Sequence, residues 1–252
     1  PYTHNIVAYM ERPADQNRIY SLGLSSIRYD VQEAYLSAKE LQEQLGIDAL
    51  LTPIDHLATR IYSQNRETAI LEWLSLTSYY YWGSYNIKDQ NSSTNVTKNV
   101  HFADEINSPA KVFTANNTPY FVNHLEQLPS PTETFVRNYG PRLHHLAIGV
   151  KDGEYNGVEN IDYVVDVIAS QGKKFLLDVI GSREEGIKQI FSSASEHSSL
   201  IIEYVQRFGD FNGFFTKQNV AELTHAAGIE SGLNSMQSMA MSGLSIAPKA
   251  GD

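Results

Sequence analysis

The chain has 252 residues, of which 42% are hydrophobic, so it can bury a sizeable core as one domain or two modules. Its formal net charge of −10 argues against nucleic acid as a partner. It contains no cysteine, so a metal ion would have to be held by His, Asp, Glu or backbone oxygen atoms.

Residues 1–52 are interpreted as a helical leader, because apolar residues recur at helical spacing over 31–45 and Gly46 can end that helix. The first module is predicted over residues 53–128. Its expected elements are a strand at 54–62, a helix at 66–78, an aromatic strand at 79–88, a polar loop at 89–98, and short strands at 100–102 and 111–114.

The second module is predicted over residues 129–227. Its expected elements are a strand at 143–150, a loop at 151–160, a helix at 161–170, strands at 175–180, 187–191 and 200–206, and a closing loop and helix at 209–224. Both modules therefore read β-α-β-β-β. Residues 228–252 are rich in Gly, Ser, Ala and Met, which predicts a flexible tail.

The first strand of each module carries a related pattern, Ile54-Asp55-His56-Leu57-Ala58 and Leu143-His144-His145-Leu146-Ala147. Strand alternation puts His56 on a face with Ile54 and Ala58, and Glu203 lies inside an apolar final strand. A lone buried histidine is more often a hydrogen-bonded core residue, and a strand glutamate is usually solvated. Their equivalent placement nevertheless predicts that His56, His145 and Glu203 form a 2-His-1-carboxylate metal site.

Three segments resemble 4-hydroxyphenylpyruvate dioxygenases: 135–147, which leads to His145; Lys188-Gln189-Ile190-Phe191; and Glu203-Tyr204-Val205-Gln206-Arg207, followed by Gly213-Phe214. The similarity covers about residues 130–225 and is weaker over 52–125, where Asp55-His56 anchors it. The wider resemblance is to the vicinal-oxygen-chelate superfamily. It implies an α+β fold in which paired βαβββ modules form a curved, partly open barrel.

By this resemblance His56, His145 and Glu203 would hold Fe(II), and the other partners would be O2 and a small-molecule substrate. The resemblance places Gln189, Phe191 and Asn116 in the substrate pocket, with Phe214 closing it. Two positions depart from the family: His144 replaces a usual Gln, and Val220 replaces an aromatic residue. We therefore expect a smaller or differently shaped chelating substrate than 4-hydroxyphenylpyruvate, with His144 beside it.

Lyases and isomerases of the superfamily commonly take a fourth, carboxylate ligand from the last strand of the first module. The corresponding segment here, 110–114, contains no acid, which favours an oxygenase over a glyoxalase-like isomerase. With the family resemblance, this implies a dioxygenase acting on a 2-oxo acid or a related chelating small molecule. An extradiol dioxygenase, a glyoxalase-like isomerase or lyase, and a non-catalytic ligand-binding protein remain alternatives. The sequence carries no secretion signal or 18-residue apolar run, so we expect a cytoplasmic protein without membrane segments, with a homodimer as one option for its assembly.

Overall fold

The computed structural model describes residues 1–7, 9, 29–88, 90–102, 109–119, 131–209, 211 and 213–230. Its helices are α1 (Tyr29–Gln44), α2 (Arg66–Leu76), α3 (Pro131–Tyr139), α4 (Asn160–Ser170) and α5 (Lys217–Glu230), with 3-10 turns η1 (Ser63–Asn65) and η2 (Val100–Phe102). Its strands are β1 (Leu51–Arg60), β2 (Tyr79–Ile87), β3 (Ser92–Asn99), β4 (Ala110–Asn116), β5 (Arg142–Val150), β6 (Glu154–Tyr155), β7 (Val158–Glu159), β8 (Ile180–Ser182), β9 (Ile187–Phe191) and β10 (Ile201–Arg207).

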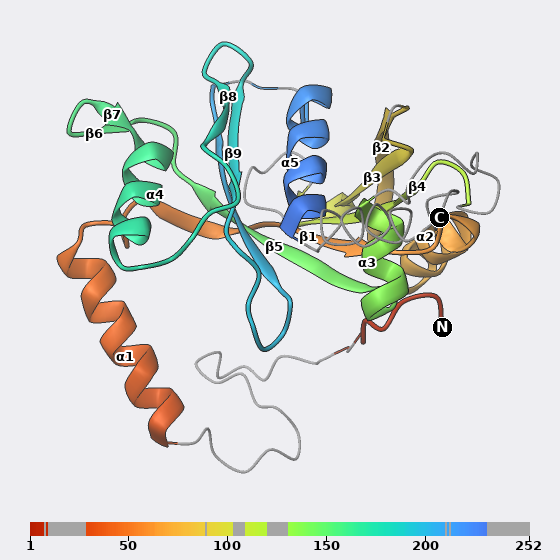
Figure 1. Ribbon diagram of the computed structural model, residues 1–252, viewed down its shortest axis with the longest axis horizontal. Coiled ribbons are helices and arrows are strands. Elements are labelled where there is room, and N and C mark those ends of the chain that lie inside the picture. Colours follow the sequence, from red (N-terminus) through yellow and green to blue (C-terminus); the bar gives the residue numbers. More distant parts are fainter. Residues whose placement is uncertain are drawn as a thin grey trace, which may run out of the picture.

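One curved sheet contains eight of these strands, in the order β2-β3-β4-β1-β5-β10-β9-β8 (Figure 1). Its two halves have the same construction. In the first half β4 pairs in parallel with β1, and in the second β10 pairs in parallel with β5. The halves join where β1 and β5 pair antiparallel. This arrangement confirms the predicted fold of paired βαβββ modules, since α2 and α4 follow the first strand of each half.

The largest error of the sequence prediction is in the first module. Residues 89–98 were expected to form a polar loop, but 92–99 form β3, whose Ser92, Ser93 and Thr94 are buried between β2 and β4. Their small polar side chains conceal a central strand from a reading based on hydrophobicity. The expected strand at 100–102 is instead the 3-10 turn η2.

In the second module the predicted strand at 175–180 is reduced to one bridge between Phe175 and Ser192, and β8 begins only at Ile180. The predicted loop at 151–160 contains the small β6–β7 hairpin, and helix α3 was not anticipated. Helix α1 projects away from the sheet (Figure 1). Residues 228–230 complete α5, and the remainder of the expected tail lies outside the described residues.

Three register shifts disturb the pairing of β1 with β5, and two of them are equivalent in the two modules. The register skips Asp55 on one strand and His144 on the other, so each is the extra residue immediately before a histidine. A bulge re-aims side chains that regular alternation would send to opposite faces. Asp55 and His144 are accordingly buried with their neighbours. The predicted inner position of Ile54 is wrong, because that side chain is 37% exposed.

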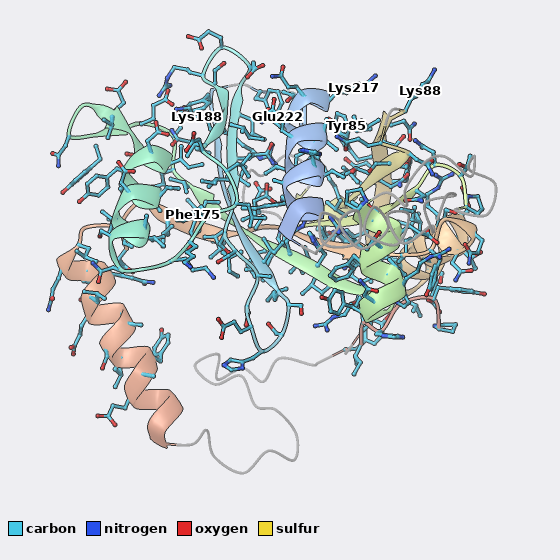
Figure 2. The ribbon with its side chains drawn as sticks, in the orientation of Figure 1. Tyr85, Lys88, Phe175, Lys188, Lys217 and Glu222 are labelled. Atoms are coloured by element: carbon cyan, nitrogen blue, oxygen red, sulfur yellow. The ribbon has the colours of Figure 1, made fainter. Side chains whose placement is uncertain are left out.

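Helix α5 lies in the mouth of the curved sheet, between β8–β9 and β2–β3 (Figure 1). Its start is held by Tyr85 of β2, whose hydroxyl accepts hydrogen bonds from the backbone N–H groups of Phe214 and Phe215 at 3.0 and 3.1 Å (Figure 2). The buried Val220 and Leu223 of α5 face the sheet interior. The helix thus covers the concave face on which the two histidines lie. No helix in the described part of the chain is long and apolar enough to cross a membrane.

Candidate metal centre

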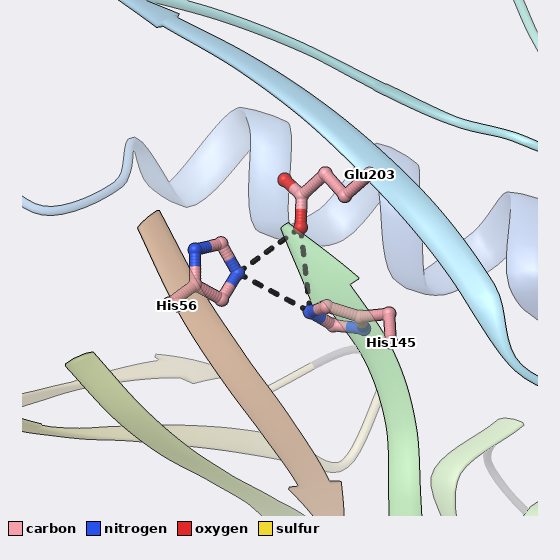
Figure 3. A group of neighbouring side chains, drawn as sticks. All are labelled: His56, His145 and Glu203. Atoms are coloured by element: carbon pink, nitrogen blue, oxygen red, sulfur yellow. Dashed lines mark hydrogen bonds and ion pairs between the residues drawn. The ribbon is translucent and has the colours of Figure 1, made fainter. Parts of the chain in front are cut away.

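His56, His145 and Glu203 come together on the concave face, from β1, β5 and β10 (Figure 3). Nε2 of His56 lies 3.0 Å from Oε2 of Glu203, Nε2 of His145 lies 3.3 Å from the same oxygen, and the two Nε2 atoms are 3.3 Å apart. All three side chains are buried. Among the described residues this is the one cluster of His, Cys, Asp or Glu with metal-binding spacing.

The donor triangle fits a divalent metal ion. Donors about 2.1 Å from an ion lie about 3.0 Å apart on an octahedral face and about 3.4 Å apart on a tetrahedral one. The observed edges of 3.0 to 3.3 Å fall within this range. Two imidazoles and a carboxylate suit iron and other first-row transition metals, and the absence of cysteine excludes thiolate sites.

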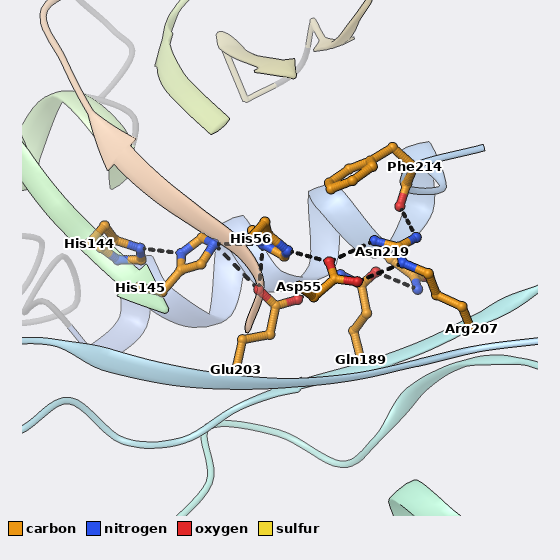
Figure 4. Close-up of polar contacts among 9 residues, drawn as sticks. All are labelled: Asp55, His56, His144, His145, Gln189, Glu203, Arg207, Phe214 and Asn219. Carbon is orange, nitrogen blue, oxygen red and sulfur yellow. Dashed lines mark hydrogen bonds and ion pairs between the residues drawn. The ribbon is translucent and has the colours of Figure 1, made fainter. Parts of the chain in front are cut away.

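A chain of polar contacts orients His56 (Figure 4). Its Nδ1 donates to Oδ1 of Asp55 at 2.7 Å, which leaves Nε2 to face the centre. Arg207 donates to both oxygens of Asp55, at 2.8 and 2.9 Å, and to the carbonyl of Phe214 at 2.6 Å. The chain therefore connects His56 to the segment that leads into α5.

The partner of His145 is different. Its Nδ1 lies 2.8 Å from Nδ1 of His144, whose ring packs against Phe135. Nε2 of His145 is available to a cation only if Nδ1 carries the ring proton and donates it to Nδ1 of His144. His56 is thus held by an ionised carboxylate, whereas His145 is held by a neutral ring.

Glu203 is oriented from β9 and α5 (Figure 4). Nε2 of Gln189 donates to Oε1 of Glu203 at 2.6 Å, and Nδ2 of Asn219 donates to Oε1 of Gln189 at 3.0 Å. The second carboxylate oxygen, Oε2, is directed at both histidines. The amide of Gln189 therefore determines which oxygen of Glu203 faces the centre.

The two histidines have opposite electrostatic surroundings. Burial alone would lower the pKa of His56, but Glu203 and Asp55 outweigh it and raise that pKa to about 9. Burial lowers the pKa of His145 well below its usual value, assisted by the positive charges of His56 and Arg60. Although burial opposes ionisation of Asp55, Arg207 holds its pKa well below the usual range. Without a metal ion, these shifts favour the protonated form of His56 and the neutral form of His145.

A cavity of about 40 Å³ adjoins His145 and Glu203, enough for about three water molecules. Of the predicted pocket residues, Gln189, Phe191 and His144 line it. Asn116 and Phe214 lie outside its lining. The ring of Phe214 packs on His56 instead, with centroids 5.6 Å apart.

Several lining residues were not foreseen from the sequence. Phe215, not its neighbour Phe214, forms part of the wall. Arg60 lines the far end, four residues after His56 on the same strand face, so strand alternation could have found it. The contacts of Asp55 and His144 with the adjacent histidines could not be found in this way, because they depend on the bulges.

The sheet of paired βαβββ modules, with its half-barrel curvature, is the vicinal-oxygen-chelate fold. No protein-family model matches the chain, and no curated protein sequence matches it significantly. Solved structures do match. A variant of 4-hydroxymandelate synthase from Streptomyces coelicolor superposes with a TM-score of 0.54 and 19% identity, covering 72% of this chain and 54% of that one.

Two further matches are more distant. A methylmalonyl-CoA epimerase variant from Streptomyces coelicolor has a TM-score of 0.47 and 14% identity, over 63% of this chain and 99% of that one. A hypothetical protein from Bacillus halodurans has a TM-score of 0.44 and 15% identity, over 64% and 97%. The chain spans about half the length of the 4-hydroxymandelate synthase. That enzyme is a dioxygenase similar to 4-hydroxyphenylpyruvate dioxygenase, so the match agrees with the resemblance found in the sequence. At 19% identity the match to the 4-hydroxymandelate synthase establishes the fold alone.

Proposed function

We propose that the protein is a non-haem Fe(II) dioxygenase whose substrate is a 2-oxo acid or a related small molecule with neighbouring chelating oxygens. The observation that carries this proposal is the buried set of two imidazoles and one carboxylate beside a cavity. Three protein donors leave three positions of an octahedral ion open, enough for a bidentate substrate and O2.

The register of the sheet supports an oxygenase over an isomerase. Glu203 lies opposite Ala147 on the parallel β5–β10 pair, two residues beyond His145. The matching position on the β1–β4 pair, opposite Ala58, is Val112. Val112 is buried and apolar, so the strand from which related isomerases and lyases take a fourth ligand supplies none here.

Each residue around the centre has a definable task. The bound ion would supply a point at which substrate oxygens and O2 meet. Asp55 holds the proton of His56 on Nδ1, and Gln189 holds Oε1 of Glu203, so that Nε2 and Oε2 remain directed at the centre. The aromatic rings of Phe191 and Phe215, with the side chains of α5, exclude bulk water from the cavity.

The experiment is anaerobic loading with Fe(II), measurement of bound iron, and O2 uptake with 2-oxo acids, catechols and 4-hydroxyphenylpyruvate. We expect one iron per chain and O2 consumption with a 2-oxo acid, and little turnover of 4-hydroxyphenylpyruvate. Glu203→Ala serves as the metal-site variant, and Glu222→Gln, an acid on α5 that bonds Gln218, serves as its control. Iron binding without O2 uptake, together with isomerisation of a test substrate, would favour the isomerase alternative.

A further inference from the structure

A buried arginine faces the cavity, and the described part of the chain gives it no acidic partner. Arg60 is 4% exposed and lines the cavity that adjoins His145 and Glu203. Its Nη1 donates to the carbonyl of Pro131 at 3.1 Å, and its guanidinium lies 5.2 Å from the ring centroid of Phe135. No carboxylate of the described residues forms an ion pair with it. A buried charge without a counter-charge is costly, so it indicates a bound anion.

The hydroxyl groups near Arg60 also favour a bound anion. The cavity wall near this end carries the hydroxyl side chains of Thr94 and Thr114, which are cross-strand partners, and of Thr132 from α3. Thr114 is also the register partner of Arg60 on β4. A guanidinium with several hydroxyls is a donor set for carboxylate oxygens. The neighbouring His144 supplies no counter-charge to Arg60, because a histidine ring is either neutral or positively charged.

The position of Arg60 relative to the metal centre determines what it could recognise. His56 and Arg60 share one face of β1, and their Cα atoms are separated by about 13 Å of strand. Most of that span can be bridged by the arginine side chain and a ligand a few carbons long. At about 40 Å³ the cavity must widen to admit even a short carbon chain, so a slender ligand fits the space between the two ends better than a bulky one.

We propose that Arg60 forms an anion-binding subsite at the end of the cavity remote from the metal centre, so that the substrate is a small chelating molecule with a second, negatively charged group. The inference rests on the proposed function in taking the metal centre as the anchor of the other end. A short 2-oxo dicarboxylate is the simplest molecule with both features. Arg60 is then a specificity residue, and its loss removes the preference for the second charge without removing metal binding.

The test uses the full chain loaded anaerobically with Fe(II) and measures ligand binding by calorimetry. The probes are 2-oxoglutarate and 2-oxoadipate, each paired with the uncharged-end analogue, 2-oxopentanoate or 2-oxohexanoate. We expect at least one diacid to bind about tenfold or more tightly than its analogue, as a charge-assisted hydrogen bond provides. In Arg60→Gln this preference should vanish while iron content and the affinity for the monoacids stay unchanged.

Arg142→Gln is the matched control, because Arg142 is the register partner of Arg60 on β5 but bonds the carbonyl of Ser198 and does not line the cavity. Arg60→Lys, which keeps the charge, should retain part of the preference. Thermal melting checks folding, and Arg60→Gln should melt no lower than the parent, since it removes an unpaired charge. If the iron-loaded parent binds diacids and monoacids equally, or if Arg60→Gln keeps the preference, the subsite is wrong and the metal centre stands.

Iron binding and glutarate binding distinguish a failure of the proposed function from a failure of the anion subsite. If the parent protein binds no iron, glutarate binding to the metal-free protein is measured instead. Glutarate binding that Arg60→Gln abolishes and Arg142→Gln preserves would support the anion subsite alone. Absence of such binding would overturn both the subsite and the metal centre.

Discussion

The two modules meet across β1 and β5 with matching registers, yet they supply the centre with different chemistry. In the first module the bulged residue before the histidine is Asp55, which is paired with Arg207. In the second it is His144, a neutral ring. The same backbone feature therefore holds one histidine with a charge and the other without one.

The inner walls differ as well. At the position of the second module's Glu203, the first has Val112. Opposite these strands, Gln189 of β9 corresponds to Thr94 of β3. Arg60 corresponds to Gly149, four residues past the other histidine, where a Cβ would collide with the hydroxyl of Thr52. The two modules therefore share their strand pairing and supply one histidine each, and the other residues proposed to bind metal and substrate are those that differ between equivalent positions.

The largest expected effect on metal binding comes from removing Glu203, the acid that has no equivalent in the first module. Glu203→Ala should weaken metal binding by more than the factor of about 10–100 that loss of an outer partner costs, because it removes a donor itself. Because Glu203 is paired with a protonated His56 in the metal-free protein, we also expect the variant to be less stable. Metal analysis and thermal melting measure the two effects, with Glu222→Gln as control. Full metal occupancy in Glu203→Ala would exclude Glu203 as an essential ligand.

The reverse test gives the first module an acid at position 112, which is equivalent to Glu203 in the second. Val112→Glu would place a second carboxylate on the wall opposite Glu203, where burial and the charge of Glu203 oppose it and the nearby His56 and Arg60 offset part of that cost. We expect a loss of about 1–3 kcal/mol in the free energy of unfolding, as for a buried polar group that is only partly compensated. Divalent metal should recover part of this loss, and O2 uptake should fall because a position for substrate is taken. Val112→Gln controls for the added volume, and an equal metal-dependent recovery in that variant would contradict a new ligand.

The opposite pKa shifts of the two histidines predict a maximum in the pH dependence of metal-free stability. The pKa of His56 is about 9 when folded, so its favourable contribution is complete below the ordinary value of about 6.5 and is lost as the pH rises toward 9. The pKa of His145 is lowered when folded, so stability falls as the pH drops below about 6.5.

Urea unfolding in the presence of EDTA at pH 5 to 9, on the order of half-unit steps, would measure this profile. The loss of stability toward pH 9 should amount to a few kcal/mol at most. It should be absent in His56→Gln, and it should disappear when metal replaces the proton. Metal affinity should rise over the same interval, because binding displaces that proton. A flat profile for the metal-free parent would contradict the protonated state of His56.

Features of the fold and site that depend on nearby sequence could be predicted, whereas features that depend on pairing between distant strands could not. The helical spacing at 31–45 and 161–170 and the apolar run at 187–191 were sufficient to predict α1, α4 and β9. The polar strand β3 was missed, because its burial follows from its neighbours in the sheet and not from its composition. The convergence of His56, His145 and Glu203 was predicted from repeat and resemblance together. The outer contacts of the centre were not, because a bulge is a property of the pairing between two strands.

The smallest expected effects concern the two bulged residues, and they compare the modules most directly. Asp55→Asn keeps the shape but removes the charge that orients His56, so we expect metal affinity to fall about 10–100-fold. His144→Gln keeps an acceptor for Nδ1 of His145 and changes no charge, so the loss should be below about tenfold. Competition with a chelator at fixed pH measures both affinities, and chemical unfolding corrects for the broken pair with Arg207. Equal losses in the two variants would show that the charge on Asp55 is unimportant to the site. The asymmetry between the modules would then concern the donors and the cavity wall alone.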